Sequence, residues 1–410
     1  MIDNLGPLRL PSFRLLWCSR LLSSMGFWMD NVATGWLALQ IGGGPAAVGT
    51  IFALRLLPFL LFGIVSGTVA DRFPRRSVLI WVSLISSALT ATTGALALGS
   101  IAFWQLALIA FLSGSAAVFD FPTRTAFAVD LVGRERLAQG VALTAVAFYA
   151  FGALGAFAAG QLVAVFGPSA AYFAIAAGHL GAALLVGLIR RPRRREAPAE
   201  PPTDFARAAG RAARLIWQNP GVRMVLVASL VVELFGYSYQ SAVPPLARDV
   251  LMVGPDGLGM LNATASAGAT LAVVLLTFVP LAVRRQPLTT GVILLWGLAQ
   301  IALAAAPGFG FALAGMLIAG GCAAAVDTLQ QTLVQLAVAE EQRGRAMGVW
   351  VFSIGTNAIG FYQVGLVGAA AGPAASLQVN GAGALLCALL ILAMAPSYRW
   401  RYAPREVGSA

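Results

Sequence analysis

Residues 45–98 decide the fold of this chain, and they read PAAVGTIFALRLLPFLLFGIVSGTVADRFPRRSVLIWVSLISSALTATTGALAL. Two apolar runs flank a short charged loop, and each run is close to the roughly 20 residues that cross a bilayer as an α-helix. The loop holds an aspartate and several arginines within residues 71–76. This pattern predicts two membrane-spanning helices that are joined at one face of the membrane.

The rest of the chain has the same character. Of its 410 residues, 59% are hydrophobic and only 10% are charged, whereas a soluble domain carries about 25% charged residues. Glycines, prolines and arginine clusters divide the chain into twelve apolar segments, near residues 13–40, 45–70, 77–98, 102–127, 138–165, 168–189, 221–247, 256–282, 287–306, 309–334, 342–369 and 373–395. The sequence therefore predicts an all-α membrane protein with twelve transmembrane helices.

The charged residues predict the orientation in the membrane. All 27 basic residues are arginine, and the formal net charge is +11. Most arginines lie in alternate loops, whereas the loops between them are nearly free of charge. By the positive-inside rule, both termini and the arginine-bearing loops are expected on the cytoplasmic side of a bacterial-type inner membrane. The basic charge therefore indicates membrane topology, and no nucleic acid partner is expected.

The longest loop divides the chain into two halves of six segments each. It covers residues 190–220 and begins with RRPRRR, followed by a proline-rich stretch. After that stretch, Asp204 is expected to cap a short interfacial helix. We therefore expect an N-terminal six-helix bundle over residues 1–189, a cytoplasmic linker over 190–220 and a C-terminal six-helix bundle over 221–410.

The two halves also share a faint internal repeat. Asp120 begins the stretch DFPTRTAFAVDLVGRERL, and Asp327 begins DTLQQTLVQLAVAEEQRGR. Arg75 recurs as Arg284 at nearly the same offset. A parallel duplication of a six-span unit accounts for these matches and predicts two pseudo-symmetric bundles related by an axis along the membrane normal.

The charged loop at residues 67–76 reads GTVADRFPRR. This spacing resembles the signature loop of the major facilitator superfamily, although Pro74 stands where that family usually has glycine. The stretches FRLLWCSRLL, DFPTRTAFAVDLVGRERLAQGVAL, YQSAVPPLARDVL and EEQRGRAMGVW resemble its enterobactin-exporter and secretion-effector-like branch. The resemblance covers nearly the whole chain. It implies the major facilitator fold, transport by alternating access, and a gating role for the loop.

The residue types in this loop suit such a role on physical grounds. A glycine permits close approach of helices, and arginines at a span end can pair with a carboxylate near the end of the fourth span. Such a cluster can hold two helix bundles together and release them, or it can simply anchor the topology. The predicted gating residues are Gly67, Asp71, Arg72, Arg75, Arg76 and Asp130.

Ionisable residues inside the apolar segments are costly and are therefore functional candidates. They are Arg20, Asp30, Arg55, Asp120, Arg124, His179, Glu233 and Asp327. Asp30 and Arg55 lie at similar distances from the turn between the first two spans, so they are expected to reach the same depth. They form either a neutralised structural pair or, if they face a cavity, a substrate or proton site.

The second group of intramembrane charges lies on two segments of the proposed repeat. Asp120 and Arg124 have the i, i+4 spacing of an intrahelical ion pair, which favours a structural role. Asp327 has Gln331 at the matching position and therefore lacks the same counter-charge, which makes it a candidate proton carrier.

A third candidate lies in the seventh segment. Glu233 is followed by Tyr237 and further polar residues. An acid beside amphipathic aromatic side chains suits a cavity that binds an organic ligand. The alternative is a hydrogen bond that contributes only to helix packing.

Several chemistries are excluded by residue type. The chain has no lysine, so it has neither a Walker A phosphate loop nor a pyridoxal Schiff base. One histidine and three widely separated cysteines give no metal-binding spacing. We therefore expect no cofactor, no metal and no enzymatic activity.

These observations and the resemblance together predict a secondary active transporter. The branch that the chain resembles implies export of a small organic molecule, siderophore-like or drug-like. The lack of a nucleotide site points to an ion gradient as the energy source, with protons as the first choice. The expected partners are this substrate, the coupling ion and the lipid bilayer, and a monomer is expected. The alternatives are a lipid or lysolipid flippase and a non-transporting membrane receptor on the same fold.

Overall fold

A computed structural model describes residues 2–133, 137–190, 220–280, 286–336 and 352–394, together with the isolated residues 210 and 217. Within these residues every regular element is a helix. The predicted interfacial helix after Asp204 lies outside the described residues, and so does Arg284. The backbone of the predicted gating loop is described, but the side chains of Asp71 and Arg72 and the surroundings of Gly67 are not.

The first half contains six long helices after a short 3-10 helix at Ile2–Arg9. They are α1 (Pro11–Gly42), α2 (Pro45–Arg72), α3 (Arg75–Leu96), α4 (Phe103–Val132), α5 (Leu137–Phe166) and α6 (Pro168–Leu188). Prolines occupy the first position of α1, α2 and α6, where no intrahelical N–H bond is lost. Gly43, Gly133 and Gly167 follow helix ends with positive φ angles, which is the usual way for a helix to stop.

The second half begins with a segment that is not one regular α-helix. It consists of α8 (Pro220–Val231), a π-helix η3 (Val232–Gly236), a 3-10 helix η4 (Tyr237–Ser241), α9 (Val243–Pro245) and a second π-helix η5 (Leu246–Val250). The remaining helices are α10 (Pro255–Phe278), α11 (Gln286–Ala304), α12 (Phe309–Leu336), α14 (Asn357–Ala371) and α15 (Pro373–Met394). Adjacent prolines within this first segment remove backbone donors, which accounts for part of its irregularity.

Among the described residues, ten helices are long and apolar enough to cross a membrane. The remaining two long elements are α1, which contains Arg14, Arg20 and Asp30, and α14, which has 15 residues. The surface agrees with a lipid environment, because large apolar side chains such as Trp81, Leu98 and Phe166 are more than half exposed. The protein is therefore a multi-pass membrane protein.

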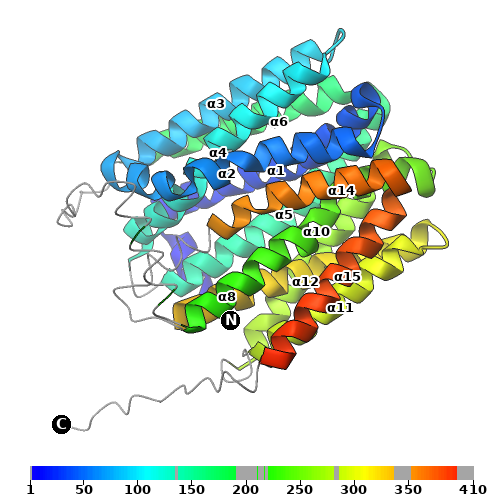
Figure 1. The fold of residues 1–410 in the computed structure, drawn as a ribbon. Helices are drawn as coiled ribbons and strands as arrows, with labels where there is room; N and C mark the ends of the chain where they lie inside the picture. Colours follow the sequence, from blue (N-terminus) through cyan, green and yellow to red (C-terminus); the bar gives the residue numbers. More distant parts are fainter. Residues whose placement is uncertain are drawn as a thin grey trace.

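The long helices lie side by side (Figure 1). In the first half α1 packs against α5 and α6, α3 against α4 and α6, and α2 against α4. In the second half α10 packs against α12, and α11 against α12 and α15. The two halves meet where α5 packs against α10 and α2 against α14. One large apolar core crosses this boundary and includes Trp28, Tyr172, Tyr239, Trp296 and Phe361.

Candidate functional site

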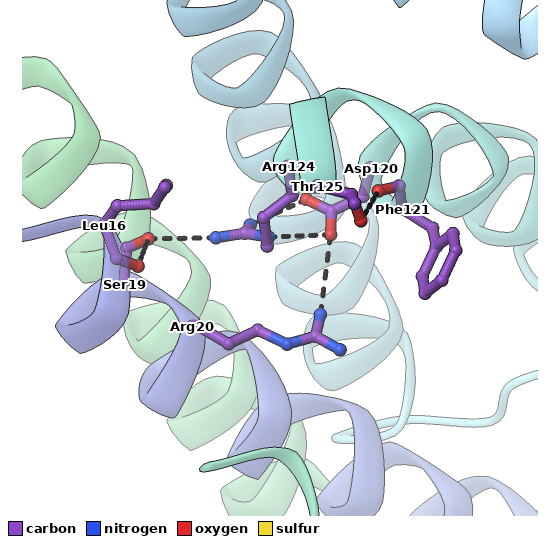
Figure 2. Close-up of polar contacts among 7 residues, drawn as sticks. All are labelled: Leu16, Ser19, Arg20, Asp120, Phe121, Arg124 and Thr125. Carbon is purple, nitrogen blue, oxygen red and sulfur yellow. Dashed lines mark hydrogen bonds and ion pairs between the residues drawn. The ribbon is translucent and has the colours of Figure 1, made fainter. Parts of the chain in front are cut away.

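The first cluster of charges joins α4 to α1 (Figure 2). Arg124 donates from Nε and Nη2 to the two carboxylate oxygens of Asp120, at 2.9 and 2.7 Å. Its Nη1 donates to Ser19 Oγ at 2.9 Å, so the guanidinium is held at both ends. The predicted i, i+4 pair is confirmed. It is a satisfied and largely buried pair, as a structural role requires.

Arg20 on α1 is a further member of this cluster. Its Nη1 lies 3.6 Å from Asp120 Oδ2, and Figure 2 shows that it reaches the carboxylate from α1, the helix that also carries Ser19. Its guanidinium also stacks over the ring of Phe148 on α5, 4.7 Å from the ring centroid. Sequence reasoning noted Arg20 as an intramembrane charge but did not assign it to the site. The signal available in the sequence was an arginine within an apolar segment that has no acidic residue four positions away on the same helix.

The second pair joins α1 to α2. Arg55 Nη1 lies 2.8 Å from Asp30 Oδ2, which confirms that the two residues reach the same depth. Thr34 donates to the other oxygen of Asp30 at 2.9 Å and shares a hydrogen bond of 2.8 Å with Tyr172. The guanidinium of Arg55 lies over the ring of Phe27 at 4.9 Å. These contacts favour the structural interpretation, and a transport role for the pair stays a prediction.

The third group lies in the second half and consists of two carboxylates. Asp327 on α12 accepts a hydrogen bond from Gln331 Nε2 at 3.0 Å. Glu233 in η3 is 5% exposed, and it lies opposite Asp327, because Ser229 and Tyr237 on either side of it hydrogen-bond to Gln330 and Ala323 on α12. Neither carboxylate forms an ion pair within the described parts of the chain. The second half therefore holds two acids, Glu233 buried and Asp327 partly buried, without a basic partner among those residues.

Aromatic residues surround these two acids. Tyr237 donates from its hydroxyl to the carbonyl of Ala323 at 2.8 Å and packs edge-on against Trp296, with ring centroids 5.0 Å apart. Tyr149 on α5 packs against an apolar cluster that includes Ala324, about one turn before Asp327, and its neighbour Phe148 lies under the guanidinium of Arg20. The groups predicted separately in the two halves therefore approach each other at α5.

The irregular segment behind Glu233 and Tyr237 is supported by neighbouring helices. Gln300 on α11 donates to the carbonyls of Phe235 and Gly236 at 3.3 and 3.4 Å. Asn380 on α15 donates to Ser238 Oγ at 2.8 Å. Non-helical backbone at membrane depth is tolerated where such groups are satisfied by protein. Sequence reasoning placed the segment correctly but did not anticipate these irregular turns.

The predicted gating loop makes contacts within the first half. Arg75 Nη1 donates to Asp130 Oδ1 at 2.7 Å and to the carbonyl of Ala126 at 3.0 Å, which joins α3 to α4. Arg76 donates to the carbonyl of Gly187 on α6. The predicted pairing of the loop arginines with Asp130 is confirmed for Arg75. A role in gating stays a prediction.

Glycines also bring the two halves into close contact near the other end of the helices. A Cβ atom on Gly49 of α2 would lie 2.6 Å from Gly365 Cα of α14. A Cβ atom on Gly259 of α10 would lie 2.7 Å from Gly160 Cα of α5. Distances below 3.0 Å do not accommodate a side chain, so these positions require glycine for the observed packing. The described side chains include no group of three His, Cys, Asp or Glu residues that could hold a metal ion.

The sequence matches one family model over almost its entire length. The model describes transmembrane secretion effectors and covers residues 2–401. The chain belongs to this family. Transmembrane secretion effectors are transporters of the major facilitator superfamily and not enzymes, which confirms the resemblance seen in the charged loop.

Curated relatives of this transmembrane secretion effector are exporters. It is 27% identical to the enterobactin exporter EntS of Salmonella typhi over 400 residues, which covers 93% of this chain and 92% of the relative. It is 28% identical to EntS of Escherichia coli O81 (strain ED1a) over 431 residues, or 97% of this chain and 95% of the relative.

Solved structures of transporters share the fold. A bacterial homologue of the human lysosomal transporter Spinster, inward-facing and unoccupied, superimposes with a TM-score of 0.70 at 17% identity, over 94% of this chain and 95% of that one. The peptide transporter of the POT family in its auto-inhibited form gives a TM-score of 0.75 at 17% identity, over 96% of this chain and 98% of that one. At this identity, the likeness establishes the fold alone.

Proposed function

We propose that this chain is a secondary active exporter of a small organic molecule, driven by a proton gradient. Twelve spans form two six-helix halves, residues 1–189 and 221–410, which are joined by the linker 190–220 and open alternately to the two sides of the membrane. Both termini lie on the cytoplasmic side of a bacterial inner membrane. The packing of α1, α3, α4 and α6 within the first half supports this division, and the two halves are joined mainly where α5 packs on α10 and α2 on α14.

One observation carries the proposal, namely the pair of acids Glu233 and Asp327. Burial of an ionised carboxylate away from water is costly unless a cation or hydrogen-bond donors compensate it. The described residues offer these two acids only the amide of Gln331 as a direct partner. Two such acids close together suit a site that exchanges a proton for a ligand, because binding of a proton or of a cationic ligand relieves the same cost of burying a carboxylate charge.

The similarity to exporters supports the direction and the class of substrate. The curated relatives are named for export of the siderophore enterobactin, and the alignment covers almost the whole of both proteins. Tyr237 and the neighbouring aromatic side chains supply apolar surface beside the acids, as an organic substrate requires. We therefore favour a siderophore-like or drug-like substrate.

The gate in this proposal is the charged loop between α2 and α3, with Asp71, Arg72, Arg75 and Arg76. Arg75 and Asp130 already join α3 to α4. Partly exposed ion pairs of this kind are weak, so they can be exchanged for other partners during a conformational change at little cost.

The test is a flux assay on the purified chain in proteoliposomes with an imposed pH gradient. Probes are 2,3-dihydroxybenzoylserine as a catecholate, ethidium as a cation and rhodamine B as a zwitterion. We expect at least one probe to move against its concentration gradient, driven by proton flow in the opposite direction. Asp327→Asn should remove the dependence on the pH gradient while the protein still inserts.

Other outcomes identify the alternatives. Movement of a fluorescent lysolipid between leaflets, with no movement of the soluble probes, would replace the exporter by a flippase. If neither the probes nor the lysolipid moves, the proposal of transport is wrong and a receptor on this fold takes its place.

A further inference from the structure

The charged cluster of the first half has an excess of positive charge. Asp120 forms ion pairs with two arginines, and the two pairs differ in distance. Arg124 approaches it at 2.7 Å with two parallel hydrogen bonds, whereas the nearest atom of Arg20 is at 3.6 Å. The Nε atom of Arg20 is buried and has no hydrogen-bond partner in the described structure. Arg20 therefore carries the charge that Asp120 leaves uncompensated.

Arg20 is placed as a ligand-binding group would be. Its guanidinium covers the ring of Phe148 at 4.7 Å, and that ring packs against Phe27 at 5.6 Å and Trp28 at 5.8 Å. The exposed fraction of its side chain is 16%, so it is neither sealed in the core nor on the surface. A cation beside a stacked aromatic surface can bind an anionic group that is attached to an aromatic frame.

The second half has the opposite excess. Glu233 and Asp327 lie on facing turns of η3 and α12, because hydrogen bonds from Ser229 to Gln330 and from Tyr237 to Ala323 join the two elements on either side of them. The described part of the chain places no arginine against either acid. A further buried group at the same place lacks a partner. Gln330 is 3% exposed, accepts from Ser229 at 3.1 Å, and leaves its Nε2 without an acceptor.

Helix periodicity places this unpartnered amide beside the acids. Ser229 precedes Glu233 by one helical turn, and Gln330 follows Asp327 by nearly one turn. The hydrogen bond between Ser229 and Gln330 therefore joins the same helix faces that carry the two carboxylates. Two acids and an unpartnered buried donor in one place indicate a site whose ligand completes the hydrogen bonding.

The excess positive charge of the first half and the excess negative charge of the second half lie on either side of two adjacent residues of α5, Phe148 and Tyr149. Phe148 stacks with Arg20, and the next residue, Tyr149, packs against an apolar cluster that includes Ala324, about one turn before Asp327 on α12. Opposite charges in a medium of low dielectric attract each other strongly. The protein nevertheless keeps these charges in different helices and different halves, where no direct ion pair between them forms in the described residues.

We propose that this site binds a zwitterionic molecule with an aromatic body. The anionic group of the ligand binds Arg20, its aromatic body lies along Phe148, and its cationic group binds between Glu233 and Asp327. This inference rests on the proposed transport function and specifies its substrate class. It also accounts for the charge balance. Arg20 and Arg124 with Asp120 carry one net positive charge, and Glu233 and Asp327 with one shared proton carry one net negative charge.

Ligands with a single charge fit this arrangement less well. A cation satisfies the two acids but leaves Arg20 uncompensated, and an anion does the reverse. Since charge-assisted hydrogen bonds to desolvated groups are among the stronger contacts in proteins, loss of either charge should weaken binding by about tenfold or more. Affinity for a matched set of ligands therefore tests the inference directly.

The experiment measures binding of three dyes to the full-length purified chain by fluorescence anisotropy. Rhodamine B carries a carboxylate and a cationic xanthylium on one aromatic frame, its ethyl ester lacks the carboxylate charge, and fluorescein lacks the cation. We expect rhodamine B to bind about tenfold more tightly than the ester or fluorescein, since each of these lacks one charge-assisted contact.

Substitutions assign each charge to its binding group. Arg20→Gln should weaken rhodamine B binding to the level of the ester and leave the ester unchanged, whereas Arg20→Lys should retain the preference for rhodamine B. Glu233→Gln together with Asp327→Asn should weaken binding of rhodamine B and of its ethyl ester, the two dyes that carry the cationic xanthylium. The matched controls are Arg190→Gln and Asp256→Asn, which change exposed residues outside the site and should bind all three dyes as the wild type does.

Several results would overturn the inference. These are equal affinity for rhodamine B and its ester, no binding of rhodamine B, or an equal loss of both dyes in Arg20→Gln when Arg20→Lys is folded. Transport itself is tested by the flux assay above, which includes probes of single charge. Movement of those probes with no preference for the zwitterion would therefore reject the substrate class and keep the transporter.

Discussion

Asp120 and Asp327 occupy similar places on α4 and α12, yet their surroundings are opposite. Asp120 has Arg124 one turn later and Arg20 from α1, so three charges and a serine hydroxyl form one compact cluster. Asp327 has Gln331 one turn later and no basic partner within the described residues. The main local difference is the residue at i+4, which is arginine in one helix and glutamine in the other.

In our proposal, this difference separates a structural acid, Asp120, from a proton-carrying acid, Asp327. A carboxylate that accepts two hydrogen bonds from a fixed guanidinium is held in its charged form and cannot easily take part in exchange. A buried carboxylate with only an amide partner can gain a proton or a ligand cation at lower cost. If the two helices descend from one duplicated unit, the change at a single position has given the two copies different roles.

The largest expected effect comes from breaking the first cluster, formed by Asp120, Arg124 and Arg20. Asp120→Asn leaves the buried Arg124 and the partly buried Arg20 without a carboxylate, and removal of one partner from such a network costs about 3 kcal/mol or more. Thermal unfolding of the purified protein in detergent should show a large drop in Tm. Asp327→Asn should leave the Tm unchanged or raise it, because it removes a charge that has no basic partner.

The control for this comparison is Asp256→Asn, which removes an exposed acid in the first turn of α10. A Tm of Asp120→Asn equal to that of the control would contradict the structural role of the first cluster. A large drop for Asp327→Asn would show that this acid has a stabilising partner.

The next effect concerns the pair of Asp30 and Arg55, which has its own hydrogen bonds and an aromatic neighbour. Asp30→Asn leaves one buried cation rather than two, so we expect a smaller loss, of about 2 kcal/mol. The double variant Asp30→Asn with Arg55→Gln should recover much of this loss, because no charge is then left unpaired.

Flux through the double variant distinguishes the two interpretations of this pair. A structural pair predicts transport close to the wild-type rate once stability is recovered. A folded double variant that no longer transports would instead place Asp30 and Arg55 in the substrate or proton site.

A third change converts the second acid into a copy of the first. Gln331→Arg gives Asp327 the same i, i+4 partner that Asp120 has, in the favourable order along the helix. We expect a folded protein whose transport driven by a pH gradient falls by about tenfold or more, since a fixed charge pair no longer exchanges its proton. Gln331→Ala is the matched control, because it removes the hydrogen bond without adding a charge. Transport by Gln331→Arg at the wild-type rate would exclude Asp327 as the proton carrier.

Much of the fold could be predicted because single segments carry their own signals. The segment expected at 168–189 is α6 at Pro168–Leu188, since an apolar run between Pro168 and a charged loop defines both ends. The contact of Asp30 with Arg55 follows from equal depth on two antiparallel helices that are adjacent in sequence. Local spacing likewise predicts the pair of Asp120 and Arg124.

Other features depend on contacts between distant segments and left no local signal. Arg20 reaches Asp120 only because α1 and α4 pack together, and no spacing within α1 indicates this. The irregular backbone near Glu233 depends on Gln300 and Asn380 from two other helices. For the same reason, the opposite charge excess on the two sides of Tyr149 could not be inferred before the halves were placed side by side.

The smallest expected effect concerns Arg75 and Asp130, which form the exposed counterpart of the buried pairs. The side chains are 28% and 39% exposed, so water and salt screen their charges. Asp130→Asn should therefore lower the stability by only about 0.5 kcal/mol. If the pair belongs to the gate, its contribution lies in the rate of conformational change, and Asp130→Asn should slow transport more than its Tm predicts. The comparison is made at low and high salt, because screening should reduce the wild-type rate toward that of the variant. Equal rates for both proteins at every salt concentration would reduce Arg75 and Asp130 to a topology anchor and leave gating to other residues.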